Sequence, residues 1–326
     1  KELTKLTFIH KEFPGHYFTR YLFKNDFINV ENYLPVKLTE KIVPRLNDQR
    51  LKEVLDNKLY FYLYYNQFNV KTPRVVMFNH GVSFYHNNEV SIVNSPEDFL
   101  FRMKALFELN PSMNSVIVKK IYASSKGSDI YKINAHEVET SHQSIQDLFK
   151  RITQSEFIFQ ETVIQHPSVD ILNPSSVNTI RMDTFIDKNG KAQVMSGYIR
   201  MSTSNTYVDN IGSGGCMVGL DLETGKLKRY GYTDFYTHPI ERLTSHPLTG
   251  TVFEGFKIPL LQEAKELITK SALLMPGLRL VGWDVAISKD GAVIIEGNSD
   301  YGVMGNDFNY GGYRAHPIFS KVLQEL

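Results

Sequence analysis

The stretch VGWDVAISKDGAVIIEGNSDY, residues 281–301, alternates apolar and polar side chains on both sides of a turn at 289–291. This alternation predicts two β-strands joined as a hairpin. The hairpin reads as buried, yet it carries Asp284, Glu296 and Asn298. Burying a charge without a partner is costly. A bound divalent cation is one partner that would remove this cost.

The register of the hairpin decides whether these side chains meet. A three-residue turn at 289–291 places Asp284 directly opposite Glu296, with Asn298 on the same face. Cross-strand neighbours have Cβ atoms ~5 Å apart, which suits one metal ion or two bridged ions. A two-residue turn would place the two carboxylates on opposite faces. Three oxygen ligands favour Mg²⁺ or Mn²⁺ over zinc.

A plainer interpretation of the same hairpin needs no ligand. Val281, Val285, Ile287 and Ile295 would form the buried side, and the polar residues would face solvent. Like charges that face each other across strands would still need an explanation.

An earlier hairpin predicts an anion site. A two-residue turn at 189–190 places Arg181 and Arg200 on one face as diagonal neighbours. Two guanidinium groups side by side repel unless an anion lies between them, and arginine binds phosphate or carboxylate through parallel hydrogen bonds. The alternative is that each arginine pairs with a carboxylate such as Asp183 or Glu161.

A weaker phosphate signal follows the strand that ends in Lys119 and Lys120. The next loop is rich in small residues, including Ser124, Ser125 and Gly127. A lysine beside such a loop can bind phosphate through its charge and the loop amides. The chain has no G-x-x-x-x-G-K-[ST] motif. A surface loop with two lysines is the alternative.

The glycine-rich tract NIGSGGC, residues 210–216, either approaches a ligand closely or bends a strand. We favour a substrate role for Asn210, Gly214 and Gly215. Cys216 reads as a small packed side chain rather than a nucleophile. No H-E-x-x-H, C-x-x-C, G-x-S-x-G or G-x-G-x-x-G motif occurs, so zinc, serine-hydrolase and dinucleotide chemistry are not expected.

Bulk composition narrows the class of protein. With 326 residues, the chain is long enough for two or three lobes. A formal net charge of +1 gives no support for nucleic-acid or membrane binding. A single cysteine excludes an intrachain disulfide framework and fits a reducing compartment. No apolar run is long enough to span a membrane and no signal peptide is evident, so a cytoplasmic location is expected.

The order of elements predicts an α+β fold. Residues 38–70 read as mostly helical, and 95–109 form a helix with Ser95 as its N-cap. From residue 177 onward the pattern is β-rich, with one amphipathic helix after Pro259. We therefore expect helices packed on largely antiparallel sheets.

Taken in order, a lysine strand with its loop, a strand ending in Gln-Glu, paired arginines and D…E-x-N resemble the ATP-grasp superfamily over roughly residues 55–300. The motifs PSSVNTIRMDT, GYIRM, VDNIGSGG, HPLTG, GWDVA and IIEGN resemble the sugar-transfer-associated ATP-grasp family. The resemblance implies two α+β lobes that clamp ATP, with an N-terminal helical and α/β region. The implied domains are 1–110, a central lobe at 111–165 and a C-terminal lobe at 166–326.

The resemblance also implies nucleotide-binding residues. Lys119 would contact the ATP phosphates, although Lys120 stands where the family usually has proline. The loop at 124–127 would close over the phosphates, and it is poorer in glycine than the family pattern. Lys58 matches an earlier ATP-binding lysine of the family.

Further roles follow from the same resemblance. Gln160, Glu161 and Val163 would form the hinge that holds adenine, while Arg181 and Arg200 would hold the γ-phosphate and the acyl phosphate that forms from it. Asp284, Glu296 and Asn298 would bind Mg²⁺.

The implied activity is an ATP- and Mg²⁺-dependent carboxylate–amine or carboxylate–hydroxyl ligase that acts through an acyl phosphate. Its partners would be small-molecule substrates, with a sugar or surface polysaccharide suggested by the family label. One alternative is an ATP-dependent phosphotransferase that stops at a phosphorylated product. The other is a nucleotide- or sugar-binding module without turnover.

Overall fold

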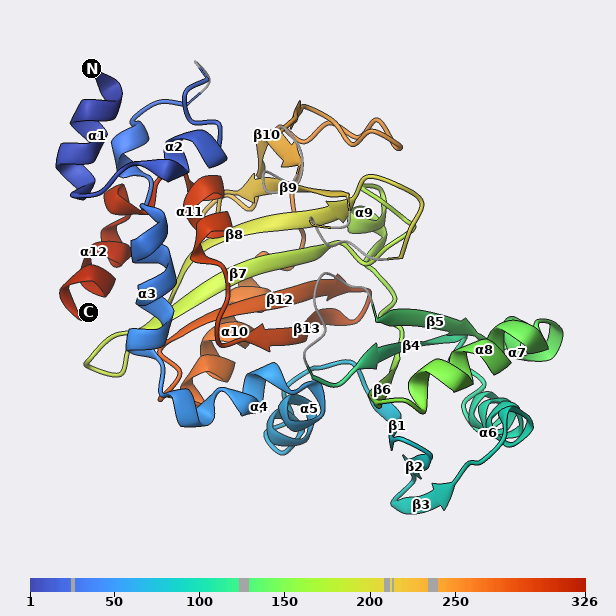
Figure 1. Ribbon diagram of the computed structural model, residues 1–326. Helices are drawn as coiled ribbons and strands as arrows, with labels where there is room; N and C mark the ends of the chain where they lie inside the picture. The colour runs from blue at the N-terminus through green and yellow to red at the C-terminus, as the bar shows by residue number, and fades with distance from the viewer. Residues whose placement is uncertain (25–26, 123–128, 208–211, 213, 234–239) are drawn as a thin grey trace. The chain divides into compact units, whose positions relative to one another are not determined.

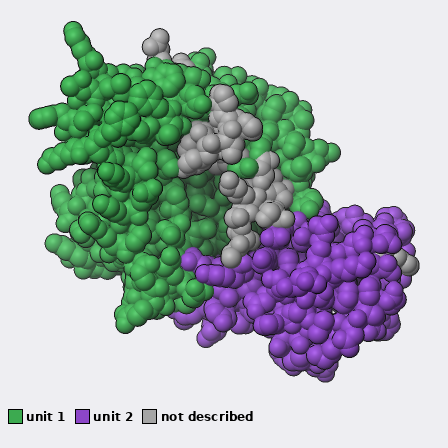
Figure 2. Space-filling view, viewed as in Figure 1, with its two compact units in different colours: residues 1–55, 165–326 green, residues 56–164 purple. Residues whose placement is uncertain are grey.

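The computed structural model describes residues 1–326 except 25–26, 123–128, 208–211, 213 and 234–239. It consists of two compact units. One is continuous in sequence and comprises residues 56–164, whereas the other combines residues 1–55 with 165–326 (Figure 2). We call them the 56–164 unit and the larger unit.

The 56–164 unit contains a six-stranded antiparallel sheet with the strand order β3-β2-β1-β6-β4-β5. Its strands are β1 (Val75–His80), β2 (Ser83–His86), β3 (Glu89–Ile92), β4 (Ser115–Lys120), β5 (Ile130–Asn134) and β6 (Glu156–Glu161). Its helices are α5 (Lys58–Asn66), α6 (Pro96–Glu108), α7 (Ala135–Thr140) and α8 (His142–Ile152).

Capping and apolar burial position the helices of this unit. The Ser95 side chain accepts a hydrogen bond from the Asp98 N–H and Pro96 occupies the first turn, as the sequence predicted for α6. Phe99 of α6 and Phe159 of β6 are fully buried in a core that lies entirely within residues 56–164. The unit thus has its own hydrophobic core.

The larger unit contains a seven-stranded antiparallel sheet with the order β11-β10-β9-β8-β7-β12-β13. Its strands are β7 (Thr179–Ile186), β8 (Ala192–Ser202), β9 (Gly215–Leu220), β10 (Leu227–Thr233), β11 (Arg242–Leu243), β12 (Leu280–Ser288) and β13 (Gly291–Asn298). Helix α10 (Leu261–Leu273) covers one face and α11 (Val303–Tyr310) lies on the other (Figure 1). The remaining helices of the C-terminal part are α9 (Pro167–Asp170), η4 (Tyr313–Ala315) and α12 (Pro317–Gln324).

The N-terminal 55 residues complete the core of this sheet. They form α1 (Glu2–His10), α2 (Gly15–Thr19), η1 (Val30–Asn32), α3 (Val36–Leu46), η2 (Gln49–Leu51) and α4 (Glu53–Asp56). Ile42 of α3 packs in one cluster with Phe185 of β7, and Leu6 of α1 packs in another with Tyr198 of β8. A buried ion pair of 2.5 Å joins Arg20 to Asp307 of α11.

The units divide the chain differently from the domains expected at 1–110 and 111–165. Strand β1 pairs with β6, so one sheet contains residues from both sides of position 110. The physical reason is that long-range strand pairing, which the sequence does not display, joins these segments. No helix in the described part of the chain is long and apolar enough to cross a membrane.

Candidate active site

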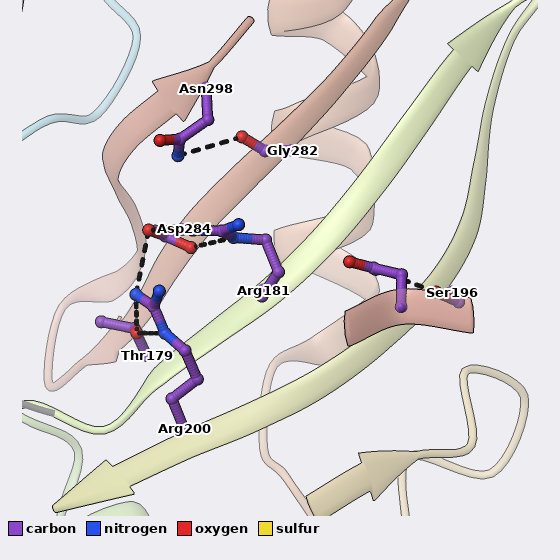
Figure 3. Close-up of polar contacts among 8 residues, drawn as sticks. Thr179, Arg181, Ser196, Arg200, Gly282, Asp284 and Asn298 are labelled. Carbon is purple, nitrogen blue, oxygen red and sulfur yellow. Dashed lines mark hydrogen bonds and ion pairs between the residues drawn. The ribbon is translucent and has the colours of Figure 1, made fainter. Parts of the chain in front are cut away.

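Two arginines converge on one carboxylate in the larger unit. The guanidinium of Arg181 on β7 binds both carboxylate oxygens of Asp284 on β12, through Nε to Oδ1 and through Nη2 to Oδ2 at 2.9 Å. Arg200 on β8 places Nη2 2.9 Å from the same Oδ2. Thr179 fixes Arg200, because its hydroxyl accepts from Nε at 3.1 Å and from Nη2 at 2.7 Å (Figure 3).

The sheet brings these side chains together through cross-strand pairing. Asp284 pairs with Arg181, and Thr179 pairs with Arg200. Side chains of paired residues project from the same face of a sheet. The face that carries α11 is therefore also the face of the arginines, because Tyr198, the partner of Arg181 on β8, lies against α11.

The predicted strand pairing is present at the site end of the β12–β13 hairpin, but the turn that leads to it differs from the one expected. The expected three-residue turn at 289–291 is wrong, because Ser288 pairs with Gly291 across a two-residue turn. A register shift between Asp284 and Val285 then restores the pairing of Asp284 with Glu296. A bulge inserts one residue into one strand of a pair, which compensates for the shorter turn.

The β7–β8 hairpin shows the same compensation. The two-residue turn predicted at 189–190 is wrong, because Ile186 pairs with Ala192 and the Asp187 N–H donates to the Lys191 carbonyl. A register shift between Met182 and Thr184 restores the pairing nearer the site. Asp187 stabilises the longer turn by accepting the N–H groups of residues 189 and 191.

Burial and pairing define the charge state of the cluster. Asp284 is 1% exposed. Burial by itself would raise the pKa of its carboxyl, but Arg181 and Arg200 hold that pKa below its ordinary value. Asp284 likewise raises the pKa of the buried Arg181 guanidinium. The arginines therefore do pair with a carboxylate, but the partner is Asp284 rather than Asp183 or Glu161.

The three proposed metal ligands lie on adjacent strands. Glu296 faces Asp284 across the β12–β13 hairpin. Asn298 pairs with Gly282, whose carbonyl accepts from its Nδ2 at 3.4 Å. Within the described ranges, no cluster of three or more His, Cys, Asp or Glu side chains could hold a metal. Two carboxylates and an amide remain, and this oxygen donor set fits Mg²⁺.

A second polar cluster beside the site was not found from the sequence. Asp183 is fully buried and accepts the hydroxyls of Tyr301 at 2.9 Å and Tyr313 at 2.6 Å, as well as the Ser196 N–H at 3.0 Å. Burial raises the pKa of Asp183, and these hydrogen bonds, together with that of the Ser196 hydroxyl, oppose the rise. The signal in the sequence was Asp183, a carboxylate within a predicted strand.

This cluster supports strand β12, which contains the residue that pairs with Asn298, a proposed metal ligand. The Tyr301 ring lies where a Cβ on Gly282 would approach within 2.6 Å, so only glycine fits there. Gly282 in turn pairs with both Asp183 and Asn298. The cluster therefore fixes the backbone that holds Asn298.

The predicted phosphate lysines lie at one end of strand β4 in the 56–164 unit. Lys119 is buried and Lys120 half-buried. The backbone N–H of Lys58, the first residue of α5, donates to the Ile121 carbonyl at 3.0 Å. This bond brings the start of α5 to the end of β4, so the segments of all three lysines are neighbours. Ser124, Ser125 and Gly127 lie outside the described residues.

The predicted hinge lies on the adjoining strand. Gln160 pairs with Ile117, is 4% exposed and has a buried Oε1 with no hydrogen-bond partner among the described residues. Such an acceptor suits a ligand donor such as an amino group. Glu161 instead forms an ion pair with Arg74 at 3.0 Å, and Val163 is half-buried. Of the three, Gln160 best fits a nucleotide contact.

The glycine-rich tract is only partly described. Gly215 begins β9 opposite Ser202, and Gly214 has a φ of +92° with open space where a Cβ would lie. The Gly214 carbonyl accepts a hydrogen bond from the Thr203 hydroxyl. Asn210 lies outside the described residues. Cys216 is fully buried, and burial raises the pKa of its thiol to about 12, which agrees with a packed side chain.

Comparison with known proteins identifies the family to which the chain belongs. Residues 37–314 match the family described as sugar-transfer associated ATP-grasp. No protein with a curated description matches the sequence. The chain belongs to the sugar-transfer associated ATP-grasp family, because the match extends over most of its length.

Solved structures give weaker likenesses. D-alanyl-alanine synthetase A from Vibrio cholerae is 13% identical with a TM-score of 0.49, covering 83% of this chain and 64% of that enzyme. The D-cycloserine synthetase DcsG is 11% identical with a TM-score of 0.48, covering 86% and 73% respectively. The D-alanine-D-alanine ligase from Coxiella burnetii is 8% identical with a TM-score of 0.44, covering 86% and 58%.

Proposed function

We propose that this protein is an ATP- and Mg²⁺-dependent ligase that joins a carboxylate to an amine or hydroxyl through an acyl phosphate. Family membership supports the use of ATP. The observation that carries the proposal is the cluster in which Arg181 and Arg200 converge on Asp284, with Glu296 opposite. It combines cations for a transferring phosphoryl group with oxygen ligands for a metal ion.

In this reaction the arginines exchange partners. Without ligand, Asp284 forms ion pairs with both guanidinium groups. Mg²⁺ held by Asp284 would leave the arginines available to the phosphoryl group and to the acyl phosphate. Thr179 retains the Arg200 side chain through two hydrogen bonds during this exchange. Preorganised cations of this kind stabilise charge that develops in phosphoryl transfer.

Bound Mg²⁺ would neutralise charge on the ATP phosphates and polarise the γ-phosphoryl group. Asp284, Glu296 and Asn298 would hold it. In the 56–164 unit, we propose that Lys119, with Lys58 and Lys120, binds ATP phosphates. Gln160, Glu161 and Val163 remain the proposed adenine hinge.

The substrates belong to the same proposal. The family description names sugar transfer. We propose a sugar, such as one of a surface polysaccharide, as one partner, joined to an amino acid or similar group. Asn210, Gly214 and Gly215 are proposed substrate contacts. The single cysteine supports a reducing compartment such as the cytoplasm.

The test is ADP formation from Mg²⁺-ATP against a panel of uronic acids, amino sugars and amino acids. We expect ADP and inorganic phosphate only when a carboxylate and a nucleophile are both present, with at least about a 100-fold loss in Glu296→Ala. Lys270→Gln, on the exposed side of α10, serves as the control with unchanged activity. A phosphorylated product without a nucleophile would indicate a phosphotransferase. ATP binding without turnover would favour a binding module.

A further inference from the structure

A cavity lies in the larger unit on the same face of the sheet as the arginines. Its volume is about 470 Å³, and it is formed by β9, β10, the end of α11 and the segment before η1. Tyr232 in this cavity pairs with Met217, which pairs with Arg200. Two strand spacings, ~10 Å, therefore separate the backbone of Tyr232 from that of Arg200.

Aromatic rings make up much of the cavity lining: Phe27, Tyr33, Tyr230, Tyr232, Phe308 and Tyr310. The rings of Tyr232 and Phe308 meet edge to face at 4.9 Å, and Phe27 packs against both. Aromatic faces combined with phenol hydroxyl groups offer both apolar contact and hydrogen bonds. This combination suits the apolar C–H faces and hydroxyl groups of a sugar ring.

Two cations and two amides accompany the rings. Lys228 donates to the carbonyls of Asn309 at 2.7 Å and Tyr310 at 2.9 Å, which uses two of its three N–H groups. Arg229 lies over the Tyr230 ring and forms a long ion pair with Glu254 at 3.8 Å, where both side chains are largely exposed and such a pair is weak. Its planar guanidinium therefore remains able to bind an anion through two parallel hydrogen bonds.

The amides add acceptors and donors to the cavity. Asn309 is 6% exposed, and no residue that the structure describes hydrogen-bonds to its buried Oδ1. Asn29 contributes a second amide to the lining. Among the described residues that line the cavity, none is acidic. The cations Lys228 and Arg229 in the lining favour an anionic ligand.

We propose that this cavity binds an anionic saccharide, such as a uronic acid unit of an oligosaccharide, and holds it on the face of the sheet that carries Arg200. The link to catalysis rests on the proposed ligase function. Saccharide binding at the cavity does not depend on the ligase function, because the residues that line the cavity differ from the metal ligands and the arginines. The ~10 Å separation predicts that a short oligosaccharide binds better than a single sugar.

The experiment is calorimetric titration of the full chain without ATP or metal, so that it reports the cavity alone. The probes are tetragalacturonic acid, galacturonic acid, neutral maltotetraose and glucose 6-phosphate. We expect the charged tetramer to bind at least tenfold more tightly than the neutral tetramer. We expect Arg229→Gln to weaken this binding about tenfold, the effect of losing a charge-assisted hydrogen bond. Tyr230→Leu tests the aromatic wall and should also weaken it.

Controls separate the outcomes. Lys270→Gln on α10 removes one positive charge on the other side of the sheet and should bind like wild type. Circular dichroism and thermal melting check that each variant folds. Equal affinity for the charged and neutral tetramers, or wild-type affinity in folded Arg229→Gln, would overturn the proposal. Tighter Arg229-dependent binding of glucose 6-phosphate than of galacturonic acid would support it with phosphate as the anion. ADP formation, measured separately, tests the ligase.

Discussion

Asp284 has two roles, and only one of them is shared by Glu296. Single substitutions at the two positions can therefore distinguish these roles. It is the buried counterion of Arg181 and Arg200, and it is a proposed metal ligand. Glu296 is only half-buried and lies opposite it. At the scale of one residue, the structure therefore distinguishes a buried counterion from a half-buried carboxylate, both of which are proposed metal ligands.

We predict that Asp284→Asn lowers the free energy of unfolding by ~3–5 kcal/mol, because it leaves two buried guanidinium groups without a counterion. Glu296→Gln should lower it by less than ~1 kcal/mol, typical of a change at a partly exposed position. Urea denaturation followed by circular dichroism measures both. Equal stability of Asp284→Asn and wild type would contradict the buried ion pair.

Two histidines near the N-terminus predict acid sensitivity. His16 is fully buried, and neither ring nitrogen hydrogen-bonds to any part of the chain that the structure describes. Burial, followed by the charges of Arg20 and His10, lowers the pKa of His16 to about 3, and burial with Arg314 lowers that of His10 to about 4. Because both pKa values are depressed in the folded state, their stabilising contribution is present above pH 6.5 and lost as the pH falls toward 4 and 3.

We predict that the free energy of unfolding of the wild type falls between about pH 6.5 and 4 more steeply than that of His16→Phe. The difference in slope should approach ~1.4 kcal/mol per pH unit, the value for one proton. His136→Gln, at an exposed histidine, is the matched control. Parallel slopes for wild type and His16→Phe would show that His16 is not neutral in the folded state.

At the scale of elements, close approach of a ring to strand β12 requires glycine. A Cβ on Gly282 would lie 2.6–2.9 Å from the Tyr301 side chain, whose hydroxyl is fixed on Asp183. We predict that Gly282→Ala destabilises the protein by ~1–3 kcal/mol through overpacking. Gly302→Ala is the control, because nothing lies within 4 Å of its Cβ position. Thermal melting of both variants checks the difference, and equal melting temperatures would contradict it.

The hairpins show which features of the elements could be predicted from the sequence. Alternation correctly predicted the β12–β13 and β7–β8 hairpins and the facing of Asp284 with Glu296. Both turn lengths were wrong, and in each hairpin a register shift cancelled the error. Bulges leave no fixed residue signature, because they depend on packing against neighbouring strands.

Contacts between segments that are distant in the sequence could not be predicted from it. The pairing of Arg181 with Asp284 joins residues 103 positions apart. Nothing in their local sequence indicates that β7 lies beside β12. For the same reason the hydrogen-bonded cluster around Asp183, built from β7, β8 and the segments around Tyr301 and Tyr313, was not predicted.

At the scale of the whole molecule, the two units differ in how they depend on the rest of the chain. The 56–164 unit is continuous and has a core of its own. The larger unit needs residues 1–55, because Leu34 and Ile42 pack with Phe185 in one of its cores. No motif in these 55 residues indicated a function, and packing is the role that the structure describes.

We predict that a fragment of residues 56–164 folds alone with a cooperative thermal transition, whereas a fragment of residues 165–326 does not. Circular dichroism melts of the two fragments, with the full chain as reference, measure this. Adding a peptide of residues 1–55 should restore a transition in the larger fragment. A cooperative transition in residues 165–326 alone would contradict the proposed dependence on the N-terminal segment.

Metal-dependent nucleotide binding tests the central claim most directly. Calorimetric titration with ATP in the presence and absence of Mg²⁺ should be made on wild type, Glu296→Gln and Asn298→Ala, with Lys270→Gln as control. We predict that Mg²⁺ strengthens ATP binding to wild type and to the control, and that this gain falls at least about tenfold in Glu296→Gln and Asn298→Ala. An undiminished Mg²⁺ effect in both folded variants would contradict a metal site at Asp284, Glu296 and Asn298.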